Sequence, residues 1–258
     1  MAPAVTAVVL AGAPPGERHP LWGENKCYLA VAGRPMLLRV VEALLASRCV
    51  GAVIVVDDAE RALAAVPPLR TLLDEGRVRF ASGADSAPAS LLEALAALRP
   101  DFPVLVTTGD NALLTAAVVD YFCSEAAAGD LAVAFASRRV VAARYPETRR
   151  TYLRFRDDSY SSCNLFLLRT DKALEAVELW RDVTQHRKSP LRVIGAFGPM
   201  ALAAYFFRRK SLEGAMELAS RRLGLSARAV TLPFAEAAID IDKPDDLMLA
   251  ERILSHRV

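Results

Sequence analysis

Five short apolar runs alternate with helical patterns along this chain, and this alternation restricts its fold more than any other feature. The apolar runs, each as long as a buried strand, are Ala4–Leu10, Ala52–Val56, Val104–Thr107, Leu131–Ala136 and Asn164–Leu168. The helical patterns include Pro35–Ala46, Ala89–Leu98 and Thr115–Ala127. Strand, helix and strand repeated at this spacing predict right-handed crossovers in a mostly parallel sheet. The expected fold class is therefore α/β.

The composition is that of one large globular domain. With 258 residues, of which 53% are hydrophobic and 24% charged, the chain can bury a substantial core. No internal repeat or low-complexity tract marks a boundary, so we expect a single domain spanning residues 1–258.

Charge and cysteine content exclude several classes of protein. The net charge of +2, with no basic run interleaved with aromatic residues, argues against a nucleic-acid partner. The four cysteines are neither spaced as metal ligands nor dense enough for a disulfide framework, which favours a reducing compartment. The chain begins with an apolar strand rather than a basic leader, and no apolar run approaches the roughly 20 residues that span a bilayer. A cytoplasmic protein is expected.

The loop that follows the first strand has the composition of a phosphate site. Gly12 and Gly16 lack side chains, so backbone N–H groups there can approach a phosphate closely. Arg18 supplies a planar fork of donors and Lys26 a compact charge, which together suit a triphosphate. An ordinary surface turn rich in Pro and Gly is the alternative.

Three motifs resemble the MobA-like nucleotidyltransferases. The first is Leu10-Ala11-Gly12 with Arg18, Lys26 and the run Gly33-Arg34-Pro35-Met36-Leu37; that family usually reads L-A-G-G-x-G-x-R, P-K and G-x-P-M-L. The second is Val104–Asp110, which is similar to the family's central strand with its metal-binding Asp. The third is Asp240-Ile241-Asp242-Lys243-Pro244-Asp245-Asp246-Leu247, which is similar to the family's D-x-D-x-P-E-D-L segment.

The resemblance implies a Rossmann-like three-layer α/β/α fold that binds a nucleoside triphosphate with Mg²⁺. Such an enzyme transfers the nucleotidyl group to a phosphorylated acceptor and releases pyrophosphate. Lys26, Arg18 and Asp110 are then the catalytic candidates, and Asp110 and Asp242 the metal ligands, with Asp240 as an alternative. The nucleotide would contact a set of residues from both motifs and from a Gly/Ser turn: Leu10, Ala11, Gly12, Gly16, Arg18, Lys26, Gly83 and Ser90. CTP is slightly favoured over GTP.

Each acidic candidate also has a purely structural interpretation. Asp110 could cap the helix that begins near Leu113, although Thr115 is suited to that role, and Asp242 could cap the helix whose first turn holds Asp245 and Asp246. The first loop also departs from the family pattern. Ala13 replaces the second glycine and Pro14-Pro15 removes N–H donors, while Asn25 stands where the family has proline.

The acceptor side is predicted from positive charge. Arg149, Arg150 and Lys188 offer donors to a phosphorylated acceptor, and Asn164 stands where family members often place an Asn near it. A solvated charged face is the alternative. We expect segments 138–160 and 185–225 to be acceptor-side insertions, the first of them a β excursion over residues 138–156.

An uncharged stretch at residues 193–207 has basic flanks, and two interpretations of it are open. One is peripheral contact with a membrane interface, and the other is a buried helix or a dimer contact. Related enzymes are often dimers, so a homodimer is also expected. Two other functions stay open: a glycosyltransferase of similar fold, disfavoured because Thr108-Gly109-Asp110 replaces its D-x-D, and a non-catalytic nucleotide-binding descendant.

Overall fold

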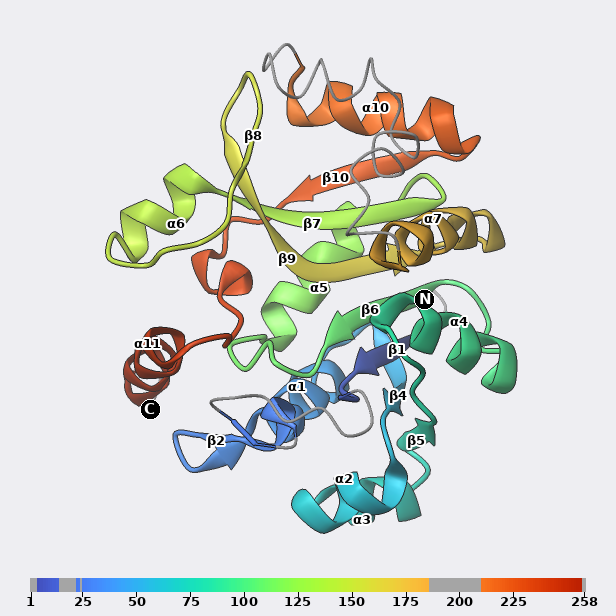
Figure 1. Ribbon diagram of the computed structural model, residues 1–258, viewed down its shortest axis with the longest axis vertical. Coiled ribbons are helices and arrows are strands. Elements are labelled where there is room, and N and C mark those ends of the chain that lie inside the picture. Colours follow the sequence, from blue (N-terminus) through green and yellow to red (C-terminus); the bar gives the residue numbers. More distant parts are fainter. Residues whose placement is uncertain (1–3, 14–21, 24, 186–209, 257–258) are drawn as a thin grey trace.

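The computed structural model describes residues 4–13, 22–23, 25–185 and 210–256. A twisted sheet runs through the molecule in the order β10-β7-β9-β6-β1-β4-β5, with β8 paired to β9 (Figure 1). The strands are β1 (Val5–Leu10), β2 (Ala30–Val31), β3 (Arg34–Pro35), β4 (Val50–Val56), β5 (Val78–Ala81), β6 (Val104–Thr108), β7 (Leu131–Ser137), β8 (Leu153–Arg154), β9 (Ser159–Leu168) and β10 (Ala227–Thr231). β2 and β3 form a separate small hairpin.

The sheet is mostly parallel, as predicted. β1 pairs in parallel with β4 and β6, β4 with β5, and β7 with β10, whereas β9 is antiparallel to both β6 and β7. All five predicted strands are present, although β9 begins at Ser159 rather than Asn164. Because β1, β4, β5 and β6 run in one direction, the loops after them meet along one edge of the sheet.

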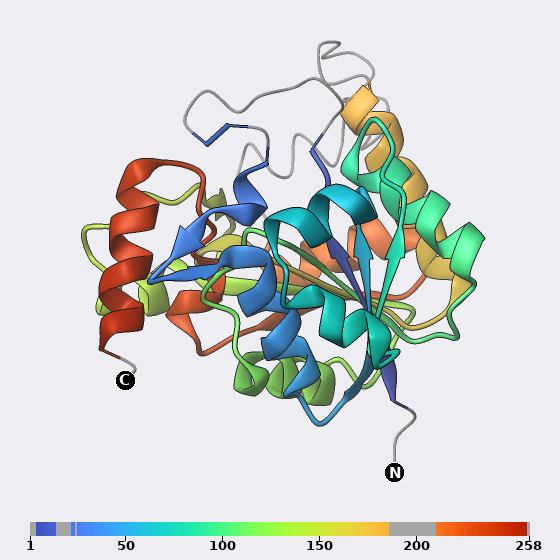
Figure 2. The ribbon, with the colours of Figure 1, turned by 90° about the horizontal axis from the view of Figure 1, so that it is seen from below.

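Helices cover both faces of this sheet, which gives three layers (Figure 2). They are α1 (Met36–Leu45), α2 (Ala59–Ala65), α3 (Leu69–Asp74), α4 (Ala87–Leu98), α5 (Ala116–Glu125), α6 (Arg138–Arg144), α7 (Leu174–Gln185), α10 (Leu212–Leu223) and α11 (Pro244–Ser255). Short 3-10 turns η1 (Lys26–Tyr28), η2 (Asp171–Ala173) and η3 (Ala235–Ala238) are also present among the described residues.

The layers follow from the alternation of side chains along each strand. In β1, Ala7 and Val9 pack into one core with α1 and α5, while Val8 packs into the opposite core with α4 and α7. A third, smaller core joins α11 to the β2 region and to η3. The mostly buried strands β1, β4 and β6 are packed from both sides, so the loops at their carboxyl ends start from rigid positions.

The expected β excursion over residues 138–156 is wrong for its first half. Residues Arg138–Arg144 form helix α6, which starts at Ser137, whose hydroxyl accepts a hydrogen bond from the Val140 N–H. Val141 is the buried residue of this helix, so its arginines face outward and hide the helical period. Only the short strand β8 lies in the second half, where it pairs with β9. In the described residues no helix has the length and apolar character needed to cross a bilayer.

Candidate active site

The loop after β1 is anchored to the neighbouring strand. The N–H groups of Ala11 and Gly12 both donate to the Val56 carbonyl of β4, at 3.2 and 2.9 Å. On the other side, the Gly109 N–H after β6 donates to the Leu10 carbonyl at 3.0 Å. A side chain at Gly109 would meet Ala11 Cβ and Cys27 Sγ at 3.0 Å, so this glycine permits a close approach of the two loops. The Gly12 N–H is already hydrogen-bonded to Val56. Gly12 would therefore help a phosphate only because it has no side chain in the way, and not as a donor.

Asn25 closes the far end of the same loop. Its side-chain amide donates to the Ala11 carbonyl at 2.8 Å and to Asp57 Oδ2 at 3.1 Å. Its side-chain oxygen accepts from the Cys27 N–H and thereby caps η1, the turn that begins with Lys26. One buried side chain therefore fixes Ala11 and Lys26 relative to each other.

Asp57 is the centre of this arrangement, directly after β4. Its carboxylate accepts hydrogen bonds from Asn25, from the Tyr28 hydroxyl at 2.6 Å and from Arg61 at 2.6 Å, and its side chain is fully buried. Burial and the neighbouring Asp57 carboxylate both raise the pKa of Tyr28 well above its ordinary value, so the phenol keeps the proton that it donates. We call Asn25, Tyr28, Asp57 and Arg61 the loop clamp. The sequence analysis missed it, although an aspartate after a buried strand was the available signal.

Lys26 stands between two of the predicted metal ligands. Its ammonium lies 2.6 Å from Asp110 Oδ2 and 2.5 Å from Asp242 Oδ1, and it also donates to the Ile241 carbonyl at 3.4 Å. Burial alone would lower the pKa of Lys26, but the carboxylates of Asp110 and Asp242 raise it well above its ordinary value. Lys26 is therefore an ammonium ion throughout the neutral and moderately alkaline range.

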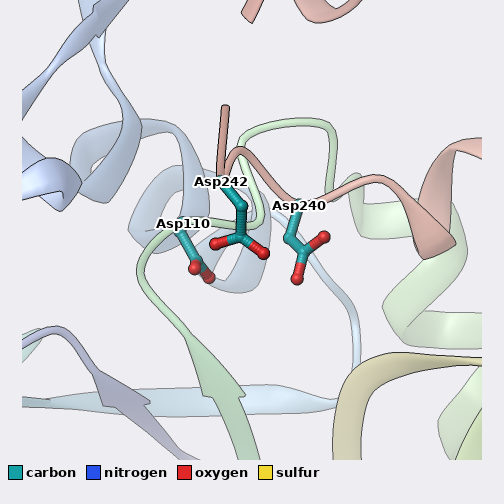
Figure 3. Close-up of side chains that lie close together, drawn as sticks. All are labelled: Asp110, Asp240 and Asp242. Carbon is teal, nitrogen blue, oxygen red and sulfur yellow. The ribbon is translucent and has the colours of Figure 1, made fainter. Parts of the chain in front are cut away.

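Three carboxylates gather at this point from two distant segments. Asp110 follows β6, whereas Asp240 and Asp242 precede α11, and one oxygen from each lies within 4.8 Å of the others (Figure 3). Asp110 is buried, and its Oδ1 has no hydrogen-bond partner. A buried carboxylate oxygen without a partner costs free energy unless a ligand satisfies it. Mg²⁺ prefers oxygen ligands and is usually held by one or two carboxylates together with substrate phosphates, so the residues present fit this ion.

Neither Asp110 nor Asp242 is a helix cap. Thr115 caps α5, accepting from the Val118 N–H as predicted. At α11, Asp246 accepts from the N–H groups of Asp242 and Lys243, both at 3.2 Å, and Asp242 leaves its own carboxylate to Lys26. The capping interpretation is wrong for both residues.

Two of the predicted acceptor residues lie against Asp240. Arg150 is ion-paired with Asp240 and, at 3.0 Å, with Asp246, while the Asn164 amide donates to Asp240 Oδ2 at 3.1 Å. Asn164 has a left-handed backbone, φ 49°, which turns it out of the regular strand β9. The Arg149 side chain is exposed, and its carbonyl accepts from Lys243. Gly16, Arg18, Lys188 and the stretch 193–207 lie outside the described residues.

Gly83 and Ser90 lie at the end of β5, further along the same edge. Ser90 is buried, and its hydroxyl both accepts from the Ala84 N–H at 2.8 Å and contacts the Ala84 carbonyl at 3.3 Å. Ser90 lies inside α4, which begins at Ala87 with Ser86 as its cap, earlier than the expected start at Ala89. The Ser90 hydroxyl therefore shapes the turn that contains Gly83.

The fold and this site define a nucleotidyltransferase: a mostly parallel α/β sheet with a lysine, a buried carboxylate and a glycine loop at its carboxyl edge. The family model of the MobA-like NTP transferase domain matches residues 7–223, and the chain belongs to that family. No match was found among curated proteins.

Solved structures share the fold. A hypothetical transferase from Thermus thermophilus is 29% identical, with a TM-score of 0.79 over 95% of this chain and 99% of its own. The 4-diphosphocytidyl-2C-methyl-D-erythritol synthase of Anaerococcus prevotii is 14% identical, with a TM-score of 0.58 over 98% and 96% of the two chains. A CMP:2-keto-3-deoxy-manno-octonic acid synthetase complexed with CTP is 17% identical, with a TM-score of 0.55 over 99% and 100%.

Proposed function

We propose that this enzyme transfers a nucleotidyl group from a Mg²⁺-bound nucleoside triphosphate to a phosphorylated alcohol, sugar or cofactor, releasing pyrophosphate. The observation that carries the proposal is the position of Lys26, within 2.6 Å of both Asp110 and Asp242, at the edge where parallel strands end. A cation and a pair of carboxylates at one point are what a metal–triphosphate complex requires.

The nucleotide would enter between the first loop and the turn after β5. Leu10, Ala11 and Gly12 would provide a closely packed backbone floor for the phosphates. The donors that we assign to the phosphates are Gly16 and Arg18. The turn at Gly83, shaped by Ser90, is assigned to the base. CTP is the first donor to test and GTP the second.

The metal would be held by Asp110 and Asp242, with Asp240 as a third oxygen donor. Bound there, Mg²⁺ supplies Lewis-acid polarisation of the phosphate oxygens. Lys26 must then give up a carboxylate contact, and its ammonium is free to follow the α-phosphate.

The reaction needs no side-chain nucleophile. An oxygen of the acceptor phosphate forms a bond to the α-phosphorus, and the bond from that phosphorus to the bridging oxygen breaks, leaving with its electron pair in pyrophosphate. A phosphate monoester is largely ionised at neutral pH, since its second pKa is about 6. No proton has to be removed, so the residues act by orientation and by offsetting charge on the transferred group.

The first test is thermal unfolding of the purified chain with each of the four nucleoside triphosphates, with Mg²⁺ and with EDTA. A ligand that binds the folded state raises the midpoint by mass action. We expect a Mg²⁺-dependent rise that is largest for one base, followed by pyrophosphate release when phosphorylated acceptors are screened. Unchanged midpoints with all four triphosphates would contradict the proposal.

A further inference from the structure

A cavity of about 360 Å³ lies between helix α6 and the chain that leads into β8 and β9. Its walls carry four arginines and two tyrosines: Arg138, Arg149, Arg150, Arg154, Tyr145 and Tyr152. No aspartate or glutamate is among the residues that line it. We call this cavity the arginine pocket. Its volume is that of a site for a small molecule rather than of a flat surface for a macromolecule.

Most of the positive charge of the arginine pocket is not neutralised within the protein. Arg150 is paired with Asp240 and Asp246. In the part of the chain that the structure describes, the side chains of Arg138, Arg149 and Arg154 form no ion pair or hydrogen bond with a carboxylate. Three guanidinium groups that converge on one cavity repel one another, and a bound anion would relieve that repulsion.

The arginine pocket shares a wall with the catalytic cluster. Arg150 lines the cavity and also contacts Asp240, whose carboxylate lies within 4.8 Å of those of Asp110 and Asp242. A ligand that fills the pocket would therefore extend directly toward the point where the transfer takes place. The Tyr145 hydroxyl is not available to it, because it donates to Glu236.

We propose that the arginine pocket binds a second oxyanion of the acceptor, a phosphate or carboxylate group distinct from the phosphate that reacts. The planar fork of arginine matches the paired oxygens of either group, and several arginines give orientation as well as charge. The inference rests on the proposed function and narrows its acceptor class. It predicts a molecule with at least two anionic groups, one at each end.

The experiment measures anion binding to the full-length chain without nucleotide. Thermal unfolding and calorimetric titration are carried out with inorganic phosphate and with succinate, in EDTA, with chloride holding the ionic strength constant. The two anions separate a phosphate-selective pocket from a carboxylate-selective one. Arg138→Gln and Arg154→Gln remove single pocket arginines, and both residues are exposed, so folding should be retained. Arg139→Gln is the matched control, because it removes a charge from the same turn of α6 but does not line the cavity.

We expect one anion to bind, with about tenfold weaker affinity in each pocket variant and unchanged affinity in Arg139→Gln. The anion that binds should also protect the pocket arginines, but not Arg139, from modification by phenylglyoxal, as mapped by mass spectrometry. Equal affinity in all variants, or no binding beyond that of chloride, would overturn the proposal.

The outcome is separable from that of the proposed function. Lys26→Gln reports any phosphate bound at the nucleotide loop, and binding of Mg²⁺ with a triphosphate is measured independently in every variant. If neither anion binds to the wild-type chain while triphosphate binding is intact, the arginine pocket alone is refuted. Anion binding without any triphosphate binding would refute the transferase proposal alone.

Discussion

Lys26 Nζ lies 2.6 Å from Asp110 Oδ2, which joins the loop after β1 to the loop after β6 at the centre of the sheet's carboxyl edge. The other oxygen of Asp110 is buried and has no partner. One carboxylate thus neutralises the lysine and still offers a free oxygen. This division of its two oxygens is what a residue needs in order to position a cation and a metal together.

Replacement of Asp110 by Ala should abolish turnover while the fold is retained. The substitution removes the buried carboxylate that we assign to the metal, and losses at such ligands are expected to reach at least about a hundredfold. Pyrophosphate release measures the loss, and circular dichroism reports the fold. Asp245→Ala, an exposed neighbour of Asp242 in the first turn of α11, is the control and should keep its activity. Full activity of Asp110→Ala, with Mg²⁺ still required, would contradict the assignment of Asp110 as a metal ligand.

Lys26 should stay charged across the working pH range. A group whose pKa is raised on folding contributes stability that is fully present below its ordinary value, near 10.5, and is lost as the pH rises through the higher folded value. The contribution of Lys26 to the free energy of unfolding should therefore stay constant from pH 7 to 10. Denaturant unfolding at intervals over this range should give the same difference between the wild-type chain and Lys26→Gln at every pH. If the wild-type chain loses stability between pH 7 and 9 and the variant does not, the lysine is not held as described.

The outline of the fold could be predicted because its strands are apolar on both faces. β1, β4 and β6 are buried by helices from two sides, so their runs stand out from the sequence without help from periodicity. Helix α6 could not be recognised in the same way. It buries mainly Val141 and presents arginines to solvent, so nothing in its pattern distinguishes it from an irregular segment.

Of the site, only the charged residues that stand within a recognisable motif could be predicted from the sequence. Lys26, Asp110 and Asp242 each follow a motif, and the structure brings them together. For the loop clamp the sequence offers one signal, the aspartate at position 57 directly after a buried strand. Its partnership with Asn25 could not be anticipated, because a neutral amide and an acid far apart in sequence meet only through the parallel pairing of β1 with β4.

The loop clamp should affect nucleotide affinity as well as stability. Asp57→Asn removes the charge that pairs with Arg61 and replaces one of the two carboxylate oxygens with an amide NH2 group. Either Arg61 or the pair Tyr28 and Asn25 then loses its acceptor, and an unsatisfied buried donor costs about 1–3 kcal/mol of unfolding free energy. Because the clamp fixes Ala11 against Lys26, we also expect weaker triphosphate binding, measured by calorimetry.

Asp58→Ala is the matched control for the clamp. Asp58 caps α2 by accepting from the Arg61 N–H, so its loss should cost about 1 kcal/mol of stability without weakening the nucleotide. Equal affinity in the two variants would mean that the clamp is purely structural.

Cys49 should be the most reactive thiol of the chain at neutral pH. Its Sγ lies 2.8 Å from that of Cys123 and 3.1 Å from the Ser47 hydroxyl. The hydrogen bond with Cys123 lowers the pKa of Cys49, burial opposes this effect, and the hydrogen bond with Ser47 lowers the pKa further. Burial raises the pKa of Cys27, and it raises that of Cys163 to about 12, so both remain thiols.

Since the thiolate is the reactive form, iodoacetamide at pH 7 should modify Cys49 first, as mapped by mass spectrometry. In Cys123→Ala, which removes the hydrogen-bonding partner of Cys49, the rate should fall at pH 7, whereas Cys163→Ala, which removes a buried thiol elsewhere, should leave it unchanged. Modification of Cys27 or Cys163 ahead of Cys49 would contradict this assignment of the thiolate.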